Sequence, residues 1–427
     1  MPAGLGAYRA AAAILGAAAP ILRRLGPPGS AWRDSFAGAS EDFGRAAGNV
    51  WVHASSMGEV LAARVWIETL IAAGQPTPLL VTTRTTRGLA RARSELAERV
   101  VARIAPIDLP RIVRSFLAGA RPQRLDLVET EIWPHLILES RRRGIAVVFV
   151  SASVSERTRR RLGRFGIAGP GLLGEGVWAL AQSERHAKRF RALGVPGERV
   201  CVTGDLKAEP PTEGASRDPA SRPAVVFGSL RPGEEAVAVA LARALGELGR
   251  DGPVLLVAPR HRAGRDRVRT ALGAAGIAFE TRFEPERSRE DLAAWVARFA
   301  SAAPPRVGIL GTQGELPSAY ELARVALVGG TFAPFGGHNV LEPAARGCPV
   351  VVGPHTDSIE AGVAALGWEG AILVARDLAA AVEGVRAILG SAERMRLMGM
   401  AAVGVAADAS RSAARSIAAL ERFGLIP

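Results

Sequence analysis

The sequence predicts an α/β protein with two Rossmann-like, doubly wound domains facing an interdomain cleft. Three observations support this prediction. Short apolar runs alternate with longer amphipathic stretches along most of the chain, which is typical of parallel strands joined by helices. The alternation is broken once, by a stretch rich in Pro, Glu, Ser and Gly at residues 207–222, which we interpret as a linker. A length of 427 residues also suits two or three domains.

The first domain is expected at residues 31–206, after an N-terminal helical segment at 1–30. Because strands that alternate with helices need right-handed crossovers, its strands should form one parallel sheet. The expected strands are at residues 50–53, 79–83, 100–104, 125–128, 145–150, 177–181 and 199–202. The expected helices are at residues 59–73, 85–97, 111–117 and 133–143.

The second domain is expected at residues 223–427, where the same alternation restarts. Two such domains would place the carboxyl ends of both sets of strands along one cleft. The expected strands are at residues 224–227, 254–257, 277–279, 307–310, 325–328, 350–352 and 371–374. The helices between them include residues 234–248 and 291–299.

Composition narrows the classes of partner. The chain is 48% hydrophobic and 22% charged, which describes a globular protein with an ample core. Its net charge is +13, but no dense Lys/Arg run with interleaved aromatic residues favours nucleic acid. Anionic lipid or a phosphorylated substrate fits this charge. The two cysteines, Cys201 and Cys348, lie in apolar contexts and indicate a reduced, cytoplasmic setting.

The N-terminal segment has an apolar, Ala-rich stretch at residues 10–22 that ends at Arg23 and Arg24. It is shorter than the ~20 residues that a spanning helix needs. It also resembles a signal peptide, but no secreted-type cysteine framework follows. We therefore expect a helix that lies on a membrane surface, with a packed N-terminal helix as the alternative.

Residues 329–356 (GGTFAPFGGHNVLEPAARGCPVVVGPHT) are typical of a nucleotide site, with a glycine turn, a short helix and a strand. Gly336 and Gly337 permit positive φ and close approach of a ligand. A helix that begins near Leu341 offers unpaired N–H groups to a phosphate, and Glu342 in its first turn could accept hydrogen bonds from a ribose. Asn339 could instead only cap this helix.

Carboxylates follow strands of the first domain. Glu59 lies at a helix start after the first strand, where it could deprotonate a hydroxyl nucleophile. The alternative is a first-turn glutamate that only stabilises the helix dipole. Glu129 and Glu131 end another strand, and one of them could cap the following helix instead. Lys207 follows the last strand of the domain, where a solvated linker lysine is the alternative.

Two motifs follow strands of the second domain. Arg260, in Pro259-Arg260-His261, suits a phosphate or carboxylate. The backbone of residues 312–316 (TQGEL) could bind a base or ribose. Five of the six histidines lie in or beside the motifs, and His186 lies in a plain helical stretch. No histidine pair has the spacing of a helical metal site, so no metal is expected.

In their order, these motifs resemble the 3-deoxy-D-manno-octulosonic acid (Kdo) transferases of lipopolysaccharide synthesis. Residues 53–59 (HASSMGE) resemble that family's HxxSxGE, residues 129–134 (ETEIWP) its ETELWP, and residues 203–207 (TGDLK) its TGNLK. The PRH, GEL, GGHN-x-LEP and GPHT segments match as well. The resemblance covers nearly the whole chain and implies a GT-B fold.

The resemblance also implies an activity, the inverting transfer of Kdo from CMP-Kdo to a lipid A precursor similar to lipid IVA. The protein would act at the cytoplasmic face of the inner membrane, peripheral or N-terminally anchored, with CMP-Kdo as substrate and no cofactor. Glu59 would be the catalytic base, and Glu129 and Lys207 would stabilise charge at the transition state. The residues that would hold CMP are Pro259, Arg260, Gln313, Gly314, Glu315, Asn339, Val340, Leu341 and Glu342.

Four segments depart from the family pattern. TPTG reads TTRG at residues 85–88, the Asn after Trp-Pro is His135, the NARLS-like turn is SASVS at 151–155, and STHxGEE is SLRPGEE at 229–235. Most of them lie on the acceptor side. Two rival hypotheses stay open, a GT-B transferase or epimerase that uses a UDP-sugar, and a non-catalytic nucleotide-binding scaffold on the membrane.

Overall fold

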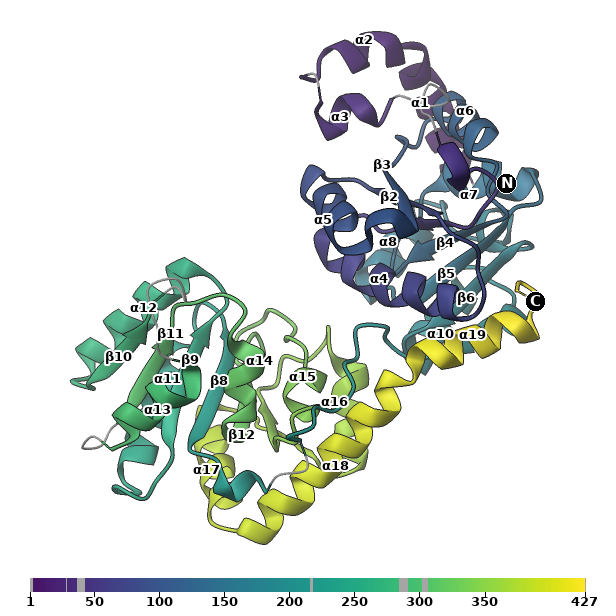
Figure 1. The fold of residues 1–427 in the computed structure, drawn as a ribbon. Helices are drawn as coiled ribbons and strands as arrows, with labels where there is room; N and C mark the ends of the chain where they lie inside the picture. Colours follow the sequence, from purple (N-terminus) through teal and green to yellow (C-terminus); the bar gives the residue numbers. More distant parts are fainter. Residues whose placement is uncertain are drawn as a thin grey trace. The chain divides into compact units, whose positions relative to one another are not determined.

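The computed structural model describes residues 3–27, 29–36, 43–215, 218–283, 291–301 and 306–426. The chain divides into two compact units. The first consists of Met1–Lys207 and Ser410–Pro427, and the second of Ala208–Ala409. Each unit contains a seven-stranded sheet in which every recorded strand pair is parallel (Figure 1).

The first sheet has the strand order β3-β2-β1-β4-β5-β6-β7. Chain order therefore reverses between β1 and β4, and the loops that leave these two strands run to opposite sides of the sheet. Such a switch point leaves a crevice at the carboxyl ends of the strands. The strands are β1 Trp51–His53, β2 Leu79–Thr83, β3 Val100–Ile104, β4 Arg124–Val128, β5 Ala146–Ala152, β6 Val177–Ala181 and β7 Val200–Val202.

The first turn of a helix has N–H groups without partners inside the helix. Helices of the first unit begin at residues whose side chains accept these N–H groups, or at proline, which has no N–H. Ser56, Thr85, Ser155 and Ser183 accept such N–H groups with their side chains, and α6 and α7 begin with proline. The helices are α4 Met57–Ala72, α5 Thr86–Leu96, α6 Pro110–Ala120, α7 Pro134–Arg142, α8 Glu156–Arg164, α9 Pro170–Leu173 and α10 Glu184–Ala192.

The N-terminal segment forms α1 Ala3–Ala17, α2 Ala19–Arg24 and α3 Ala31–Asp34. One face of α1 packs on the unit, with Leu5 buried and the Tyr8 hydroxyl donating to Asp108 at 2.7 Å. Other apolar side chains of the segment are exposed. They are Ile14, Leu15, Ile21 and Leu25. None of the helices in the described residues is both long enough and apolar enough to cross a membrane.

The second sheet has the strand order β10-β11-β9-β8-β12-β13-β14, with its reversal between β8 and β12. The strands are β8 Ala224–Leu230, β9 Val254–Pro259, β10 Phe279–Arg282, β11 Val307–Leu310, β12 Ala323–Val328, β13 Val350–Val352 and β14 Ile372–Val374. The helices are α11 Glu235–Gly246, α12 Arg262–Ala274, α13 Leu292–Ala300, α14 Leu316–Glu321, α15 Leu341–Ala344, α16 Glu360–Trp368, α17 Leu378–Leu389 and α18 Ala392–Ser410.

One strand was expected two residues too early. The sequence predicts a strand at 277–279, whereas β10 is Phe279–Arg282. Ile277 is buried in the hydrophobic core although it lies in the turn before the strand. A buried apolar residue in a turn has the same sequence signature as the first residue of a buried strand.

The expected domain boundaries are wrong at two places. Residues 410–427 belong to the first unit, where Figure 1 shows α19 Ser412–Arg422. Ala419 and Leu420 of this helix are buried in the core that α4 covers. Arg124 also donates to the carbonyl of Leu425 at 2.9 Å. Residues 208–215 of the expected linker belong to the second unit, where the Thr212 N–H donates to the carbonyl of Ala345 at 3.0 Å.

Candidate active site

Glu59 lies in the first turn of α4, directly after the loop that leaves β1. Ser56 and Glu59 form a capping box, in which the Glu59 N–H donates to Ser56 Oγ at 3.3 Å. Glu59 Oε2 accepts from the N–H of Ser55 at 2.6 Å and of Ser56 at 3.3 Å. Glu59 therefore stabilises the start of α4, which is the role that the alternative interpretation gave it. Its carboxylate also lies at the switch point of the first sheet.

The surroundings of Glu59 also make it more basic than an ordinary glutamate. Burial raises the pKa of Glu59, and the negative charges of Glu131 and Glu129 raise it further. The hydrogen bonds from Ser55 and Ser56 oppose this shift without cancelling it. The structure thus brings together three carboxylates that follow two strands, and the pKa of one of them, Glu59, is raised, as a general base requires.

Glu131 is a functional candidate that the sequence analysis did not select. It lies 3.4 Å from His53 Nε2, and it accepts a hydrogen bond from the indole N–H of Trp133. Burial alone would raise the pKa of Glu131, but the hydrogen bonds and charges of His53, Trp133 and Arg84 outweigh burial and lower it. Glu131 therefore keeps its negative charge beside Glu59. The first-turn N–H groups of His135 and Leu136 in α7 donate to the carboxylate of Asp108, at 3.0 and 2.8 Å, so the expectation that Glu129 or Glu131 could cap this helix is wrong.

Glu129 and Lys207 form an ion pair at the same edge of the sheet. Glu129 has a φ of 62°, a left-handed conformation that a non-glycine residue rarely adopts. The turn that carries Lys207 is fixed by Asp205, whose Oδ1 accepts from Ser151 Oγ at 3.1 Å and from the Lys207 N–H at 3.0 Å. Lys207 is therefore a paired residue of the site edge and not a solvated linker lysine.

Two hydrogen bonds from the C-terminal helix α19 hold this turn in place. Ser412 Oγ donates to the carbonyl of Asp205 at 2.8 Å, and Arg415 Nε donates to the carbonyl of Thr203 at 2.9 Å. Sequence reasoning missed both contacts, because more than 200 positions separate each pair of residues. No local sequence pattern predicts such a contact.

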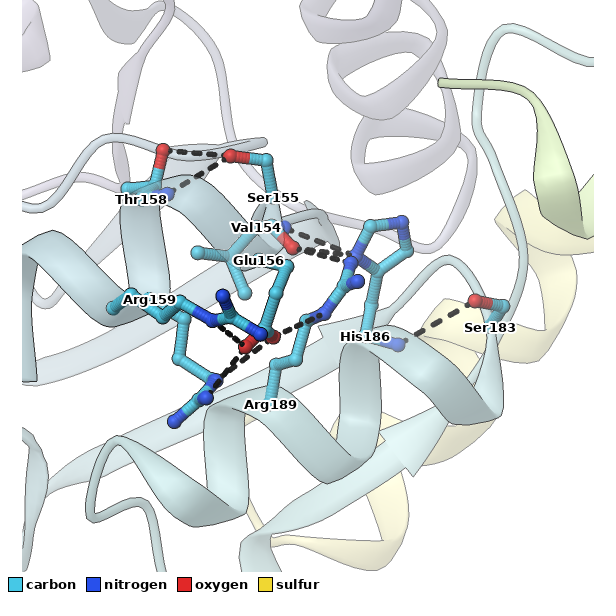
Figure 2. Close-up of polar contacts among 9 residues, drawn as sticks. Val154, Ser155, Glu156, Thr158, Arg159, Ser183, His186 and Arg189 are labelled. Atoms are coloured by element: carbon cyan, nitrogen blue, oxygen red, sulfur yellow. Dashed lines mark hydrogen bonds and ion pairs between the residues drawn. The ribbon is translucent and has the colours of Figure 1, made fainter. Parts of the chain in front are cut away.

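The loop after β5 is anchored by side chains of α10 (Figure 2). The Val154 N–H donates to His186 Nδ1 at 3.0 Å, and Arg189 donates to the Val154 carbonyl at 2.9 Å. Burial lowers the pKa of His186, so its ring is neutral and can accept. The preceding residue, Ser153, accepts a hydrogen bond from Thr130, which lies between Glu129 and Glu131. His186 is thus an anchor of the site edge, a role that its plain helical context did not indicate.

A cavity of about 190 Å³ opens beside His53 in the first unit. Its walls include the apolar side chains of Trp32, Ile107 and Leu136. Arg84 also lines it, and the Arg84 guanidinium lies 4.3 Å from the ring centroid of Trp133. The cavity therefore combines apolar walls with a cation.

The second unit has a cavity of about 410 Å³ at the carboxyl ends of β9 and β11. It is lined by four of the nine residues expected to hold CMP, and by neighbouring cations. The four are Pro259, Arg260, Gln313 and Gly314. The cations are Arg262 and Arg265. Because β11 pairs with β9, the two motifs that follow these strands lie next to each other.

The side chain of Glu315 is already engaged within the protein. Arg282, which is almost fully buried, binds its carboxylate with contacts of 2.8–3.1 Å, and Thr312 donates to it as well. Burial would raise the pKa of Glu315, but the hydrogen bonds from Arg282 and Thr312 lower it. Glu315 can therefore offer a ligand its backbone, whereas its carboxylate fixes the loop.

The glycine turn after β12 has the expected backbone. Gly336 and Gly337 have φ values of 85° and 94°. Asn339 Oδ1 accepts from the Leu341 N–H at 2.9 Å, so Asn339 does stabilise the start of α15. Burial raises the pKa of Glu342, while the charge of Arg346 and, more weakly, that of Arg260 lowers it. Glu342 thus lies within electrostatic range of Arg260.

Glu234 is a further residue that sequence reasoning missed. It is fully buried, and its two carboxylate oxygens accept four backbone N–H groups at 2.8–3.2 Å. These donors belong to Arg231, after β8, and to Gly330, Phe332 and Ala333, after β12. Glu234 therefore ties together the two loops that diverge at the switch point of the second sheet.

Comparison with known proteins gives a consistent result. Residues 30–209 match a family model described as 3-deoxy-D-manno-octulosonic-acid transferase (kdotransferase). The 3-deoxy-D-manno-octulosonic acid transferase of Bordetella pertussis is 33% identical over 94% of this chain and 94% of its own length. The chain belongs to the Kdo transferase family. The Haemophilus influenzae 3-deoxy-D-manno-octulosonic acid transferase is 29% identical, over 72% of this chain and 71% of its own.

Comparison with solved structures confirms the expected GT-B fold of this Kdo transferase. The UDP-GlcNAc 2-epimerase of Neisseria meningitidis matches with a TM-score of 0.61 over 88% of this chain and 100% of its own. The sequence identity is only 12%, so the likeness shows the fold alone. The family shows that the chain is a glycosyltransferase of lipopolysaccharide synthesis.

Proposed function

We propose that this Kdo transferase moves Kdo from CMP-Kdo to a lipid A precursor, with inversion at the anomeric carbon. The observation that carries the proposal is the state of Glu59, a carboxylate made more basic by burial and by two neighbouring carboxylates. A sugar hydroxyl is a poor nucleophile unless its proton is removed as the new bond forms. Glu59 would take this proton in a single displacement, which inverts the configuration.

The other catalytic roles in the proposal follow from charge. Positive charge develops at the anomeric carbon as CMP leaves, and negative charge develops on the departing phosphate. The ion pair of Glu129 and Lys207 contains one group of each sign, so it could stabilise both as they form. Arg260 would contact the phosphate of CMP with a charge-assisted hydrogen bond.

The acceptor proposal is supported by the cavity beside His53. A lipid A precursor carries acyl chains and phosphates on a sugar, and the cavity combines the apolar walls of Trp32, Ile107 and Leu136 with the cation Arg84. We also assign the protein to the cytoplasmic face of the inner membrane, either as a peripheral protein or anchored by its N-terminal segment. The exposed apolar side chains of α1 and α2, followed by Arg23 and Arg24, suit contact with anionic lipid.

The test is a transfer reaction with CMP-Kdo as donor and a tetra-acylated lipid A precursor as acceptor, presented in anionic phospholipid vesicles. We expect a product heavier by one or more Kdo residues, with inverted anomeric configuration in its NMR spectrum. CMP should inhibit the reaction and UDP should not, and the enzyme should sediment with the vesicles. Turnover of UDP-sugars without turnover of CMP-Kdo would contradict the proposed donor. Nucleotide binding without any turnover would favour a scaffold.

A further inference from the structure

Four cationic or potentially cationic side chains meet at the switch point of the second sheet. Arg231 follows β8, Arg260 and His261 follow β9, and His338 follows β12. Arg231 Nη1 lies 2.9 Å from His261 Nε2. Arg231 and His338 flank Gly330, since a Cβ built there would lie 3.5 Å from Arg231 Cγ and 3.1 Å from His338 Cδ2.

Glu342 lies within electrostatic range of Arg260, but within the described parts of the chain neither Arg231 nor His338 forms an ion pair with a carboxylate. The carboxylate oxygens of Glu234 accept backbone N–H groups, and Glu235 binds Arg267 and the Gly233 N–H. Arg231 Nε and His338 Nε2 are buried, and neither has a hydrogen-bond partner among the described residues. Buried polar groups are normally paired, so this pattern indicates a site that a ligand completes.

The electrostatics agree with a site for an anion. Burial lowers the pKa of His338 to about 4, and the positive groups Arg260, Arg231 and His261 contribute to this shift. The His338 ring is therefore neutral at physiological pH, and it can offer one N–H to a ligand. The Arg231 guanidinium lies over the ring of Phe335, 4.3 Å from its centroid. Nη1 of this guanidinium faces His261, whereas Nε has no partner among the described residues, so the guanidinium has N–H donors left for a two-oxygen ligand.

We propose that Arg231 and His338 bind the carboxylate of the donor's sugar, so that the second unit selects a sugar acid over a neutral sugar. The inference rests on the proposed CMP-Kdo donor. That donor carries two anionic groups, the phosphate of CMP and the carboxylate next to the anomeric carbon of Kdo. Arg260 in the 410 Å³ cavity is assigned to the phosphate, and Arg231 supplies a second fork for the carboxylate. A nucleotide donor with a neutral sugar has only the phosphate.

The identity of residue 231 is a second argument for this proposal. Arg231 stands where the related pattern STHxGEE has histidine. An arginine can hold a carboxylate with two parallel hydrogen bonds and is always charged, whereas a histidine offers a single N–H from each nitrogen. The substitution should therefore matter for binding of CMP-Kdo and not for binding of CMP.

The experiment compares two ligands that differ by the sugar. The KM for CMP-Kdo and the inhibition constant of CMP are measured for the wild type and for Arg231→Gln, Arg231→Lys and His338→Gln. Arg231→Gln should raise the KM for CMP-Kdo by about 10-fold or more, because a charge-assisted pair is lost. The inhibition constant of CMP should change less than about twofold. Arg231→Lys should recover part of the loss, and His338→Gln should show a smaller effect in the same direction.

The matched control is Arg267→Gln, which removes a surface guanidinium bound to Glu235 on the neighbouring helix. It should leave both constants unchanged, and thermal melting of each variant reports whether it is folded. Equal weakening of CMP and CMP-Kdo in Arg231→Gln would show that Arg231 binds the phosphate, and it would overturn the inference. Unchanged constants in both Arg231 variants would overturn it as well. A wild type that transfers nothing from CMP-Kdo would instead refute the proposed function.

Discussion

The two sheets have similar switch points with opposite charge. In the first unit, the loops after β1 and β4 bring together Glu59, Glu129 and Glu131. In the second, the loops after β8 and β12 bring Arg231 and His338 together. Both edges hold a non-glycine residue in left-handed backbone, Glu129 at φ 62° and Ser229 at φ 56°. The fold thus decides where a ligand can bind, and the loop side chains decide which step each edge performs.

The sheets also differ in one detail of strand order that shapes the donor side. In the first sheet β3, the third strand of the chain, lies directly beside β2. In the second, β11 lies between β9 and β10. This insertion places the loop that carries Gln313 and Gly314 next to Arg260, and it creates the 410 Å³ cavity.

The largest effect is expected when Glu59, at the acidic switch point of the first sheet, is substituted. Glu59→Gln keeps the size of the side chain but cannot take a proton, so we expect the transfer rate to fall by ~10²–10⁴-fold. The affinity for CMP should stay nearly unchanged, because CMP is assigned to the second unit. Steady-state transfer assays and calorimetry with CMP check both parts. A variant that retains most of the wild-type turnover would return Glu59 to a purely structural capping role.

The next largest effect concerns the proposed CMP site of the second unit. Arg260→Ala should weaken CMP binding by ~1.5–3 kcal/mol, or about 10- to 150-fold, through loss of a charge-assisted phosphate contact. Glu342→Ala should weaken it as well, through loss of the ribose contact. Calorimetry measures the affinity, and circular dichroism confirms that the variants fold. Unchanged CMP affinity in both variants would mean that the donor site is misplaced.

A smaller effect is expected when a contact that holds the turn carrying Lys207 is removed. Arg415→Ala removes the contact to Thr203, so the turn that carries Lys207 should become less well positioned. We expect the transfer rate to fall by roughly 3- to 30-fold, below the ~10²-fold loss that a 1 Å displacement can cause. CMP affinity should not change. Arg422→Ala at the far end of α19 is the control, and an equal loss there would show that α19 acts only through stability.

The smallest effect is a shift of the pH profile. Glu59 acts as a base only when it is deprotonated, so kcat/KM should rise as pH increases through its raised pKa. Glu131→Gln removes one negative charge that raises this pKa, so the rise should move to lower pH. Glu68→Gln, on the exposed side of α4, should leave the profile in place. A profile that does not move in Glu131→Gln would show that the two carboxylates are not coupled.

Much of the fold could be predicted from the sequence because parallel strands are buried on both faces. Such strands are continuous apolar runs, as in the stretch Val147–Val150, and they stand out between amphipathic helices. The turn residue Ile277 shows where this signal fails, since burial alone does not distinguish a strand from a packed turn. The position of α19 could not be predicted, because an amphipathic helix can pack against either unit.

The site shows the same division between local and long-range information. Glu59, Arg260 and Gly337 could be selected as candidates because each lies in or close after a strand end or glycine turn that the sequence indicates. Glu131 could not be chosen over Glu129, because its neighbours His53 and Arg84 come from other strands and loops. Long-range pairings such as Arg415 with Thr203 depend on tertiary structure that no local motif encodes.

The position of α19 has a consequence for how the protein is made. A polypeptide leaves the ribosome from its N-terminus, and α19 follows the whole second unit in the chain. The apolar surface that Ala419 and Leu420 cover in the first unit therefore stays uncovered until the whole second unit has been synthesised. Expression of residues 1–207 alone would leave that surface permanently open to aggregation. A first unit intended for study in isolation needs residues 410–427 joined back to it by a short linker.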